Sequence, residues 1–502
     1  MRVFGRVAFV LVIGSALITS GAAEKPTLEH IFPAGASRNS THTLTLFGKF
    51  DAWPPKAWSS CGVLVFNFPT NKGKVEIKVP ADAPVGPCLF RLYSEEGASE
   101  PCIFVVDEGS ECEENEPNNH FSKPQLITNL PVTINGRLEK NGDVDSYGFQ
   151  IKAGQWLDAA VDSYTLMSTV DPVLRLVDTN GYQIAWNHDF ATFDPRLIWQ
   201  SPQDQMVVLQ LFGFLYPANS EIQLSGGPGG VYRLHLALLD HRPVDVFPEI
   251  TEHEPNNSKA NAVTINVPGK VVGTICPAND EDRFRIQLKK DQYIEARVEA
   301  GSFGSPLDAW LKIEDSAGKE LARNDDVDSS RDPRLEWKAP NDGDYVVVVG
   351  SVTHEGNADF RYRLEINPLS PDYRATAGAN AFIFTPGATN EIKFTLKRLR
   401  GLTNELSASV TGLPESITEA GQSSSAKEGE NTLRFVVATN ALPFSAPIQI
   451  VLRDSLSKQE RPVPFQLVSR SENNGVPGGY TQLLVETLDQ LWLTVKPKAE
   501  KK

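Results

Sequence analysis

Apolar and polar residues alternate with a period of two in short stretches along most of the chain. Tyr147, Phe149 and Ile151 are separated by single residues, and the stretch 284–288 repeats this spacing. Because a period of two places successive side chains on opposite faces of a strand, each stretch predicts a half-buried β-strand. Turn sequences, DTNG at 178–181 and DSAG at 315–318, lie between apolar runs. Helical periodicity is nearly absent, and the pattern predicts an all-β protein.

Two segments, 114–236 and 252–366, are copies of one unit. EENEPNN at Glu113–Asn119 corresponds to TEHEPNN at Thr251–Asn257, 138 positions later. Further along, GDVDSYGFQI corresponds to NDEDRFRIQL, DPRLIW to DPRLEW, and VYRLHL to RYRLEI. A sustained match at a nearly constant offset indicates a tandem duplication. With turns every 8–12 positions or so, each unit predicts a β-sandwich.

The regions that flank the repeats also read as strands. The chain has 502 residues, which is too long for one hydrophobic core and predicts roughly three to four domains. Its N-terminal part contains a Pro-x-Gly turn and a Thr/Leu alternation at 43–46, and its C-terminal part has four more alternating stretches. We expect tandem β-sandwich domains, immunoglobulin-like and jelly-roll-like. The expected ranges are 24–108, 113–240, 250–368 and, for an immunoglobulin-like sandwich, 370–497.

Residues 1–23 predict a secretory signal peptide. Arg2 and Arg6 precede an apolar run at 7–18, and small residues follow at 21–23. The run is shorter than the roughly 20 residues that a membrane span requires, and no later run is long enough. We therefore expect a secreted, periplasmic or cell-surface protein with no membrane span in the mature chain.

Charge and cysteine content narrow the possible partners. The net charge is −15, and such an acidic protein repels nucleic acid but suits divalent cations. Export permits disulfides. Cys88 and Cys102 flank the turn SEEGAS, which favours a bridge between them and leaves Cys61 with Cys112, although three pairings of these four are open. Cys276 is expected to be a buried free thiol.

The repeated motifs carry a resemblance to a known family. An EPNN opening, a GDxDxY/F strand start, an NDD…DP loop and a closing YRL strand together resemble the bacterial pre-peptidase C-terminal (PPC) domain. That domain is a β-sandwich attached to many secreted proteases and related to the collagen-binding modules of clostridial collagenases. The chain departs from the pattern at His188, at the missing glycine before Asp280, and at Asn119 and Asn257, where aspartate is common. The collagen-binding role is not carried over, because no matching tyrosine set is present.

The layout of the whole chain resembles another group of proteins. Its N-terminal part resembles an IPT/TIG immunoglobulin-like sandwich. This domain followed by two PPC-like units is similar to large secreted proteins of planctomycete-type bacteria. The resemblance implies architecture and location, not chemistry.

Acidic and amide side chains gather where each repeat begins. Pro117 stiffens the opening segment, so that alternate side chains project to one side, and a pair of aspartates begins a strand about 25 residues on. Calcium prefers six to eight oxygen ligands, and in the collagen-binding relatives the matching residues ligate calcium. The resemblance thus implies one Ca²⁺ site in each repeat. The predicted ligands are Glu114, Glu116, Asn118, Asn119, Asp143 and Asp145 in the first copy and Glu252, Glu254, Asn256, Asn257, Asp280 and Asp282 in the second.

A structural interpretation of the same residues stays open. Asn and Asp cap turns by accepting hydrogen bonds from nearby backbone, so both motifs can be linker turns. The acidic loop Asn324–Asp332 lacks the sixth-position glycine and twelfth-position glutamate of an EF-hand, and we expect a solvated turn there.

No catalytic motif occurs in the sequence. There is no Gly-x-Ser-x-Gly, no His-Glu-x-x-His and no phosphate-binding glycine loop, so we expect a non-enzymatic binding or scaffold protein with an extracellular protein or polysaccharide as partner. One alternative is an accessory component of a secreted protease system, or an unrecognised peptidase site in 370–497. A second is carbohydrate or cell-wall binding through Trp186, Phe190 and Phe193, for which core packing is the competing interpretation.

Overall fold

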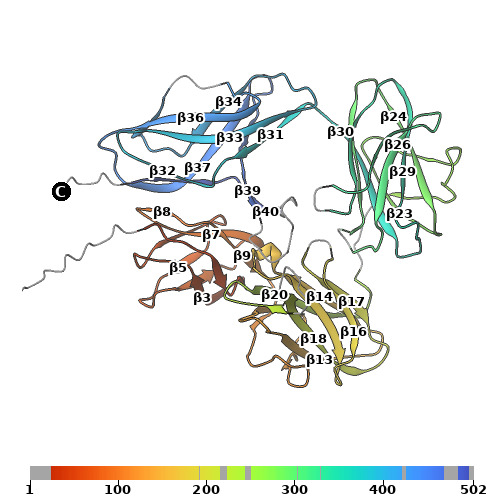
Figure 1. The fold of residues 1–502 in the computed structure, drawn as a ribbon, viewed down its shortest axis with the longest axis horizontal. Helices are drawn as coiled ribbons and strands as arrows, with labels where there is room; N and C mark the ends of the chain where they lie inside the picture. The colour runs from red at the N-terminus through yellow and green to blue at the C-terminus, as the bar shows by residue number, and fades with distance from the viewer. Residues whose placement is uncertain are drawn as a thin grey trace, which may run out of the picture.

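The computed structural model describes residues 24–190, 193–214, 223–243, 250–301, 304–327, 330–420, 425–468 and 484–496. The predicted signal peptide lies outside the described residues. The described chain is all-β, as the alternation predicts, and its strands form four successive pairs of sheets, which we call sandwiches 1 to 4 (Figure 1). Each sandwich encloses an apolar core of its own.

Sandwich 1 contains two antiparallel-rich sheets. The first has the order β1 (His30–Phe32), β3 (Ser40–Phe47), β6 (Lys74–Val79), β5 (Val65–Asn67). The second has the order β2 (Gly35–Ser37), β9 (Cys102–Asp107), β7 (Gly86–Ser94), β4 (Lys56–Ser59), with β8 (Gly97–Ala98) beside β7.

Sandwiches 2 and 3 are formed by the two repeats, and each of the ten described strands in the two sheets of one has a counterpart in the other, with β19 as an addition in sandwich 2. In sandwich 2 one sheet runs β10 (Glu111–Glu113), β12 (Val132–Arg137), β20 (Val231–Leu239), β14 (Trp156–Asp162), β17 (Arg196–Gln200). The other runs β11 (Gln125–Leu126), β13 (Asp145–Ile151), β18 (Gln205–Phe214), β15 (Pro172–Asp178), β16 (Gln183–Asn187), with β19 (Leu224–Ser225) beside β18. A 3-10 turn, η1 (Tyr164–Leu166), follows β14.

Sandwich 3 repeats this order. Its first sheet runs β21 (Ile250–Thr251), β23 (Gly269–Thr274), β30 (Arg361–Leu369), β25 (Tyr293–Glu299), β28 (Arg334–Lys338). Its second runs β22 (Val263–Thr264), β24 (Glu281–Leu288), β29 (Gly343–Ser351), β26 (Ala309–Glu314), β27 (Glu320–Asn324). The turn motifs behave as predicted, since Asp178 and Asp315 each accept two backbone N–H bonds from the residues that follow them.

Sandwich 4 contains the four C-terminal alternating stretches as strands. One sheet runs β31 (Asp372–Ala377), β33 (Thr389–Leu399), β36 (Gly429–Val437), β35 (Ile417–Glu419). The other runs β32 (Ala381–Phe384), β41 (Leu491–Val495), β37 (Phe444–Asp454), β34 (Leu406–Thr411), with β38 (Glu460–Pro462) beside β37. A separate hairpin joins β39 (Phe465–Val468) to β40 (Leu484–Leu488).

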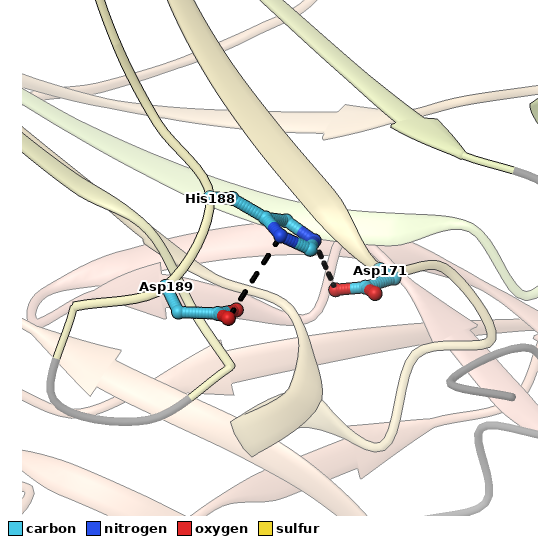
Figure 2. Close-up of side chains that lie close together, drawn as sticks. All are labelled: Asp171, His188 and Asp189. Carbon is cyan, nitrogen blue, oxygen red and sulfur yellow. Dashed lines mark ion pairs between the residues drawn. The ribbon is translucent and has the colours of Figure 1, made fainter. Parts of the chain in front are cut away.

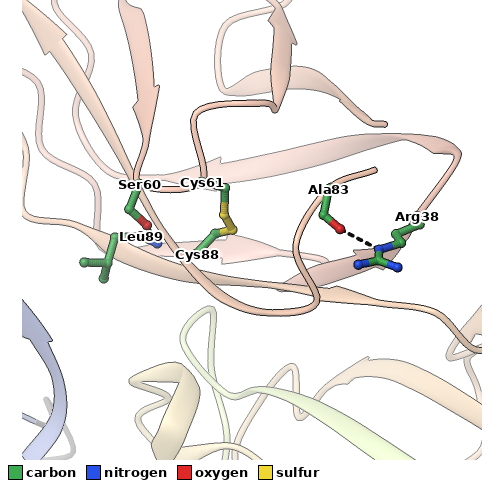
Figure 3. Close-up of a disulfide and its surroundings, with 6 residues drawn as sticks. All are labelled: Arg38, Ser60, Cys61, Ala83, Cys88 and Leu89. Atoms are coloured by element: carbon green, nitrogen blue, oxygen red, sulfur yellow. Dashed lines mark hydrogen bonds between the residues drawn. A yellow bond between two sulfur atoms is a disulfide. The ribbon is translucent and has the colours of Figure 1, made fainter. Parts of the chain in front are cut away.

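The disulfide differs from the pairing that the sequence favoured. Cys61 is bonded to Cys88, with a Cα–Cα distance of 5.6 Å (Figure 3). The predicted Cys88–Cys102 bridge is wrong because the register of β7 and β9 sets Cys88 opposite Phe104, two residues away from Cys102. The predicted partner of Cys61 was Cys112, which is a free thiol. Cys276 is also free, but it is exposed rather than buried.

Sandwiches that are distant in sequence touch each other. Arg91 on β7 is fully buried beside the rings of Trp58 and Trp492, which also contact each other, and its guanidinium donates to Asn380 Oδ1 of sandwich 4 (3.3 Å), 289 positions away. Figure 1 shows sandwich 4, in blue, beside sandwich 1. The hairpin β39–β40 and η1 share a small apolar cluster with sandwich 1.

Candidate metal centres

The two opening segments lie against the strands that follow them. In sandwich 2, Glu114 Oε2 accepts a bond from the Arg137 backbone N–H at the end of β12 (2.9 Å). The Asn118 carbonyl accepts from the Ser146 N–H at the start of β13 (3.2 Å). In sandwich 3, Glu252 Oε1 accepts from the Thr274 N–H at the end of β23 (2.5 Å). The calcium hypothesis requires that each opening segment packs beside the following strands, and these hydrogen bonds place it there.

Carboxylate oxygens converge in both repeats. In sandwich 2, one oxygen from each of Glu116, Asp143 and Asp145 lies within 4.8 Å of the others. In sandwich 3 the same holds for Glu252, Glu254 and Asp282. The floor of each cluster is buried, whereas Glu116 and Glu254 are exposed, so each cluster opens to solvent on one side.

Buried oxygen atoms without a partner occur at the same positions in both copies. Asn118 and Asp145 are 1% and 0% exposed, and the Oδ1 atom of each lacks a hydrogen bond. Asn256 and Asp282 are both 0% exposed and repeat the pattern at the two Oδ1 atoms, although Asn118 Nδ2 is also unpaired whereas Asn256 Nδ2 donates to Glu252 Oε2 (3.2 Å). Leaving a buried acceptor unsatisfied costs about 1–3 kcal/mol, so four such atoms in matching places point to a missing positive partner.

The raised pKa values of the buried carboxylates also indicate that positive charge is lacking near each cluster. Burial, reinforced by Glu114, raises the pKa of Asp145 to about 10, and burial raises the pKa of Glu114 to about 7. Burial together with Glu252 raises the pKa of Asp282 to about 9. Among the described residues, none of these carboxylates forms an ion pair with lysine or arginine. Ionised carboxylates in this setting require a cation to compensate their burial.

Part of the predicted ligand set caps a turn instead. Asn119 Nδ2 donates to Asp143 Oδ1 (2.5 Å), and the Glu139 N–H donates to Asp143 Oδ2 (2.7 Å). Asn257 donates to Asp280 in the same way, and Asp280 Oδ2 accepts from the Cys276 N–H (2.9 Å). These four residues therefore have the structural role of turn caps, and Asp143 has it in addition to supplying one of the converging oxygens of sandwich 2.

Sequence reasoning missed one tyrosine in each site. Tyr232 OH on β20 donates to Asp145 Oδ2 (2.5 Å) and lies 3.3 Å from Glu114 Oε2. Tyr362 OH on β30 makes the same contacts with Asp282 (2.6 Å) and Glu252 (3.3 Å). The signal was available, because this tyrosine occupies the same place in VYRLHL and RYRLEI.

A glycine makes room for each tyrosine. A Cβ atom at Gly136 on β12 would overlap the ring of Tyr232, and one at Gly273 on β23 would overlap Tyr362 and Glu252. Glycine is therefore required at both positions for the hydroxyl to reach the carboxylates.

The aromatic set of the first repeat is only partly exposed. Trp186 is 57% exposed, as a binding residue would be. Phe193 packs on the Tyr164 ring (5.2 Å between centroids), and Phe190 lies against Arg196 and next to Gly304 of sandwich 3. Packing thus accounts for two of the three aromatics.

The acidic loop of sandwich 3 behaves as a turn where it is described. Asp332 Oδ1 accepts from the N–H groups of Ala300 and Gly301, and Asn324 Oδ1 accepts from the Arg334 N–H. No helix in the described part of the chain has the length and apolar character to cross a bilayer.

Comparison with known proteins adds limited information. No family model matches the chain. A probable subtilase-type serine protease of Deinococcus radiodurans is 35% identical over 117 residues, which are 22% of this chain and 15% of that protein. The chain thus spans only a small part of that relative.

Three solved structures are distant neighbours. The fibronectin(III)-like modules of Clostridium thermocellum CbhA are 10% identical (48% of this chain, 93% of that chain, TM-score 0.16). The M60 catalytic domain with two CBM51 domains from Clostridium perfringens ZmpB is 9% identical (69% and 46%, TM-score 0.15). Domains 1–6 of the surface layer protein SbsC are 10% identical (91% and 58%, TM-score 0.15). At these TM-scores none of the three bears on function.

The chemistry of the donors fits a hard divalent cation. Each site offers carboxylate and amide oxygens from both buried and exposed residues, and the converging groups found among the described residues there contain no sulfur or imidazole. Calcium takes such ligands in variable geometry, whereas transition metals favour nitrogen or sulfur.

Proposed function

We propose that this chain is a secreted, non-catalytic binding or scaffold protein, and that sandwiches 2 and 3 are PPC-like domains that each bind one Ca²⁺. The observation that carries the calcium proposal is the pair of unsatisfied buried oxygens, on Asn118 and Asp145, that recurs on Asn256 and Asp282. Secretion rests on the sequence features of residues 1–23.

The residues that would hold the ion follow from the geometry. In sandwich 2 they are Glu116, Asp143 and Asp145 together with Asn118, and in sandwich 3 they are Glu252, Glu254 and Asp282 together with Asn256. When bound, calcium supplies positive charge against the buried carboxylates. Because the ligands come from the opening segment and from the strand start, binding ties the two together and stiffens the point where each sandwich begins.

Thermal unfolding of residues 24–502 in EDTA and in millimolar calcium tests this function. The whole chain is preferable to the isolated repeats, because η1 of sandwich 2 packs against sandwiches 1 and 4. A site at 100 times its dissociation constant stabilises the folded state by about 2.7 kcal/mol, so we expect a rise of several degrees in Tm.

The double variant Asp145→Asn, Asp282→Asn is the matched control. Asparagine keeps the shape of the protonated side chain but cannot supply charge, so the variant should fold in EDTA and lose the calcium response. No rise in the parent, or an equal rise in the variant, would return both motifs to linker turns.

A protease-associated role is the second candidate, and the partial match to a subtilase-type serine protease favours it. The matched stretch of 117 residues is about as long as one repeat, which is compatible with a module that this chain shares with that protease. A broad protease assay of the purified chain, with and without serine and metal inhibitors, tests for activity. Inhibitor-sensitive cleavage would refute the non-catalytic function.

Polysaccharide binding remains a proposal for the exposed Trp186, since an exposed indole offers a flat apolar face to a sugar ring. A glycan array with the parent and Trp186→Ala tests it. Binding that the substitution leaves unchanged would remove this residue from consideration.

A further inference from the structure

A histidine lies between two aspartates on sandwich 2, away from the calcium residues. Asp171 precedes β15, and His188 and Asp189 follow β16 (Figure 2). His188 Nε2 is 3.2 Å from Asp171 Oδ1, and His188 Nδ1 is 3.8 Å from Asp189 Oδ2. One donor atom from each of the three residues lies within 4.8 Å of the others.

Two of these donor atoms are shielded from solvent without a hydrogen bond. Asp171 Oδ1 and His188 Nε2 both lack a hydrogen-bond partner, although they face each other. The two atoms are close enough for an ion pair, but their geometry does not meet the angular requirements of a hydrogen bond. An ion placed between a ring nitrogen and a carboxylate oxygen would satisfy both atoms at once.

We propose that Asp171, His188 and Asp189 form a binding site for a divalent transition metal of the zinc class. One imidazole nitrogen and two carboxylate oxygens suit zinc, while calcium prefers oxygen alone. Asp171 already meets Nε2 of His188, whereas the half-exposed Asp189 lies against Nδ1 and has to move toward Nε2 to join the same ion. Three protein ligands leave a fourth position for water.

The second repeat has aspartate where the first has His188, so the two repeats can be compared at this position. The matching residues of sandwich 3 are Asp308, Asp325 and Asp326, an all-carboxylate set. In the part of the chain that the structure describes, these three do not form a converging group. The proposed site therefore belongs to sandwich 2 alone.

The site lies where the two repeats touch. Phe190, two residues after His188, lies so close to Gly304 of sandwich 3 that a Cβ atom there would meet its ring. The charge of Arg331, also on sandwich 3, acts on Asp189. A metal at His188 would fix the positions of His188 and Asp189, two residues and one residue before Phe190, and so favour one arrangement of the two sandwiches.

Zinc titration calorimetry of residues 24–502 tests the site, after EDTA treatment and with calcium in excess so that hard-cation sites are filled. All proteins carry Cys276→Ser, because this exposed thiol would itself bind zinc. We expect His188→Ala to remove one zinc equivalent or to weaken it by more than about tenfold, since even the loss of an outer-shell partner costs roughly 10–100-fold. His354→Ala, which removes an exposed histidine of sandwich 3, is the matched control and should bind as the parent does.

Two more variants guard against a folding defect. His188→Gln keeps a polar side chain of similar size, and His188→Asp recreates the residue set of sandwich 3; both should keep the parent Tm without zinc and lose the zinc equivalent. The proposal is overturned if the parent binds no zinc, or if His188→Ala or His188→Gln binds it as the parent does. Because calcium is held constant, failure here leaves the calcium sites untouched.

Discussion

Asp145 and Asp282 define the chemistry of the two repeats at the scale of single residues. Each is a fully buried carboxylate with one oxygen on a tyrosine hydroxyl and the other oxygen without a hydrogen bond. A carboxylate in this setting is stable either when it is protonated or when a cation is bound. The pH dependence of stability distinguishes these two states.

Without metal, the stability of the protein should fall as pH rises. Burial raises the pKa of Asp145 to about 10 and of Asp282 to about 9, against an ordinary value of about 3.9 in the unfolded chain. Between these values the folded state keeps protons that the unfolded state has released, so the free energy of unfolding decreases with pH. Melting in EDTA across this range checks the sign, and saturating calcium should remove the slope because the ion binds the ionised form.

The Asp145→Asn, Asp282→Asn protein isolates the contribution of these two groups. It should show a smaller decline in Tm between about pH 5 and pH 8 than the parent does. A decline of the same size in both proteins would mean that other groups cause it.

Gly273 should tolerate no side chain. Alanine there would overlap Tyr362 and Glu252, and overpacking of this kind costs about 1–3 kcal/mol. Gly343→Ala is the control in the same sandwich, because a Cβ atom at Gly343 meets nothing within 4 Å. Urea unfolding should show a clear loss for Gly273→Ala and a change within about 0.5 kcal/mol for Gly343→Ala.

At the scale of elements, each candidate site is a junction between an opening segment and strand ends. The segment bonds to the end of β12 or β23, the aspartates lie at the start of β13 or β24, and the tyrosine comes from β20 or β30. The capping residues hold the junction whether or not an ion is present, so structural and ligand roles should separate by mutation.

Asp143→Ala and Glu116→Ala should have different effects. Asp143 accepts from Asn119 and from the Glu139 N–H, so its removal should cost about 1–3 kcal/mol already in EDTA, where no ion is bound. Glu116 is exposed and accepts only a local bond from the Asn118 N–H (3.0 Å) in the described structure, so its removal should weaken calcium binding with little change in EDTA. Denaturant unfolding under both conditions measures this; similar losses for the two variants would show that the roles are not separate.

At the scale of the whole molecule, the four sandwiches are joined by specific side chains. Arg233 on β20 is fully buried and donates to Glu111 (2.7 Å) and Asp107 (3.2 Å), where sandwich 1 leads into sandwich 2. Arg91 joins sandwich 1 to sandwich 4, and burial lowers its pKa to about 10. Its Nε and Nη1 atoms have no hydrogen-bond partner, so the two indole rings supply much of its environment.

Arg91→Ala should loosen the contact between sandwiches 1 and 4. The change removes two cation–π contacts, each worth up to about 2 kcal/mol when desolvated, and one hydrogen bond. We expect a larger radius of gyration in small-angle scattering, with the strand content unchanged in circular dichroism. Arg453→Ala, at an exposed position on β37, should leave the radius as it is; an unchanged radius for Arg91→Ala would show that other contacts hold the two sandwiches together.

The sequence by itself determined the strand pattern, the duplication and the acidic and amide residues of both candidate sites, but not their tyrosines, Tyr232 and Tyr362. Alternation, turn motifs and spacing are local properties of the sequence. A half-buried strand can be predicted from them because its core-facing side chains are apolar at every second position. The duplication gave further information, because a residue type that recurs at the same place in both copies, such as Asp145 and Asp282, is singled out from its neighbours.

Only the tertiary structure decided which atoms meet. The disulfide depends on the register of β7 against β9, which places Cys88 two residues out of line with Cys102. The division of the acidic residues into caps and unpaired oxygens depends on which backbone N–H and amide groups each carboxylate meets after folding. The contact of Asp171 with His188 likewise joins residues from separate segments, and their convergence depends on how the chain folds back on itself, which no local pattern of residues encodes.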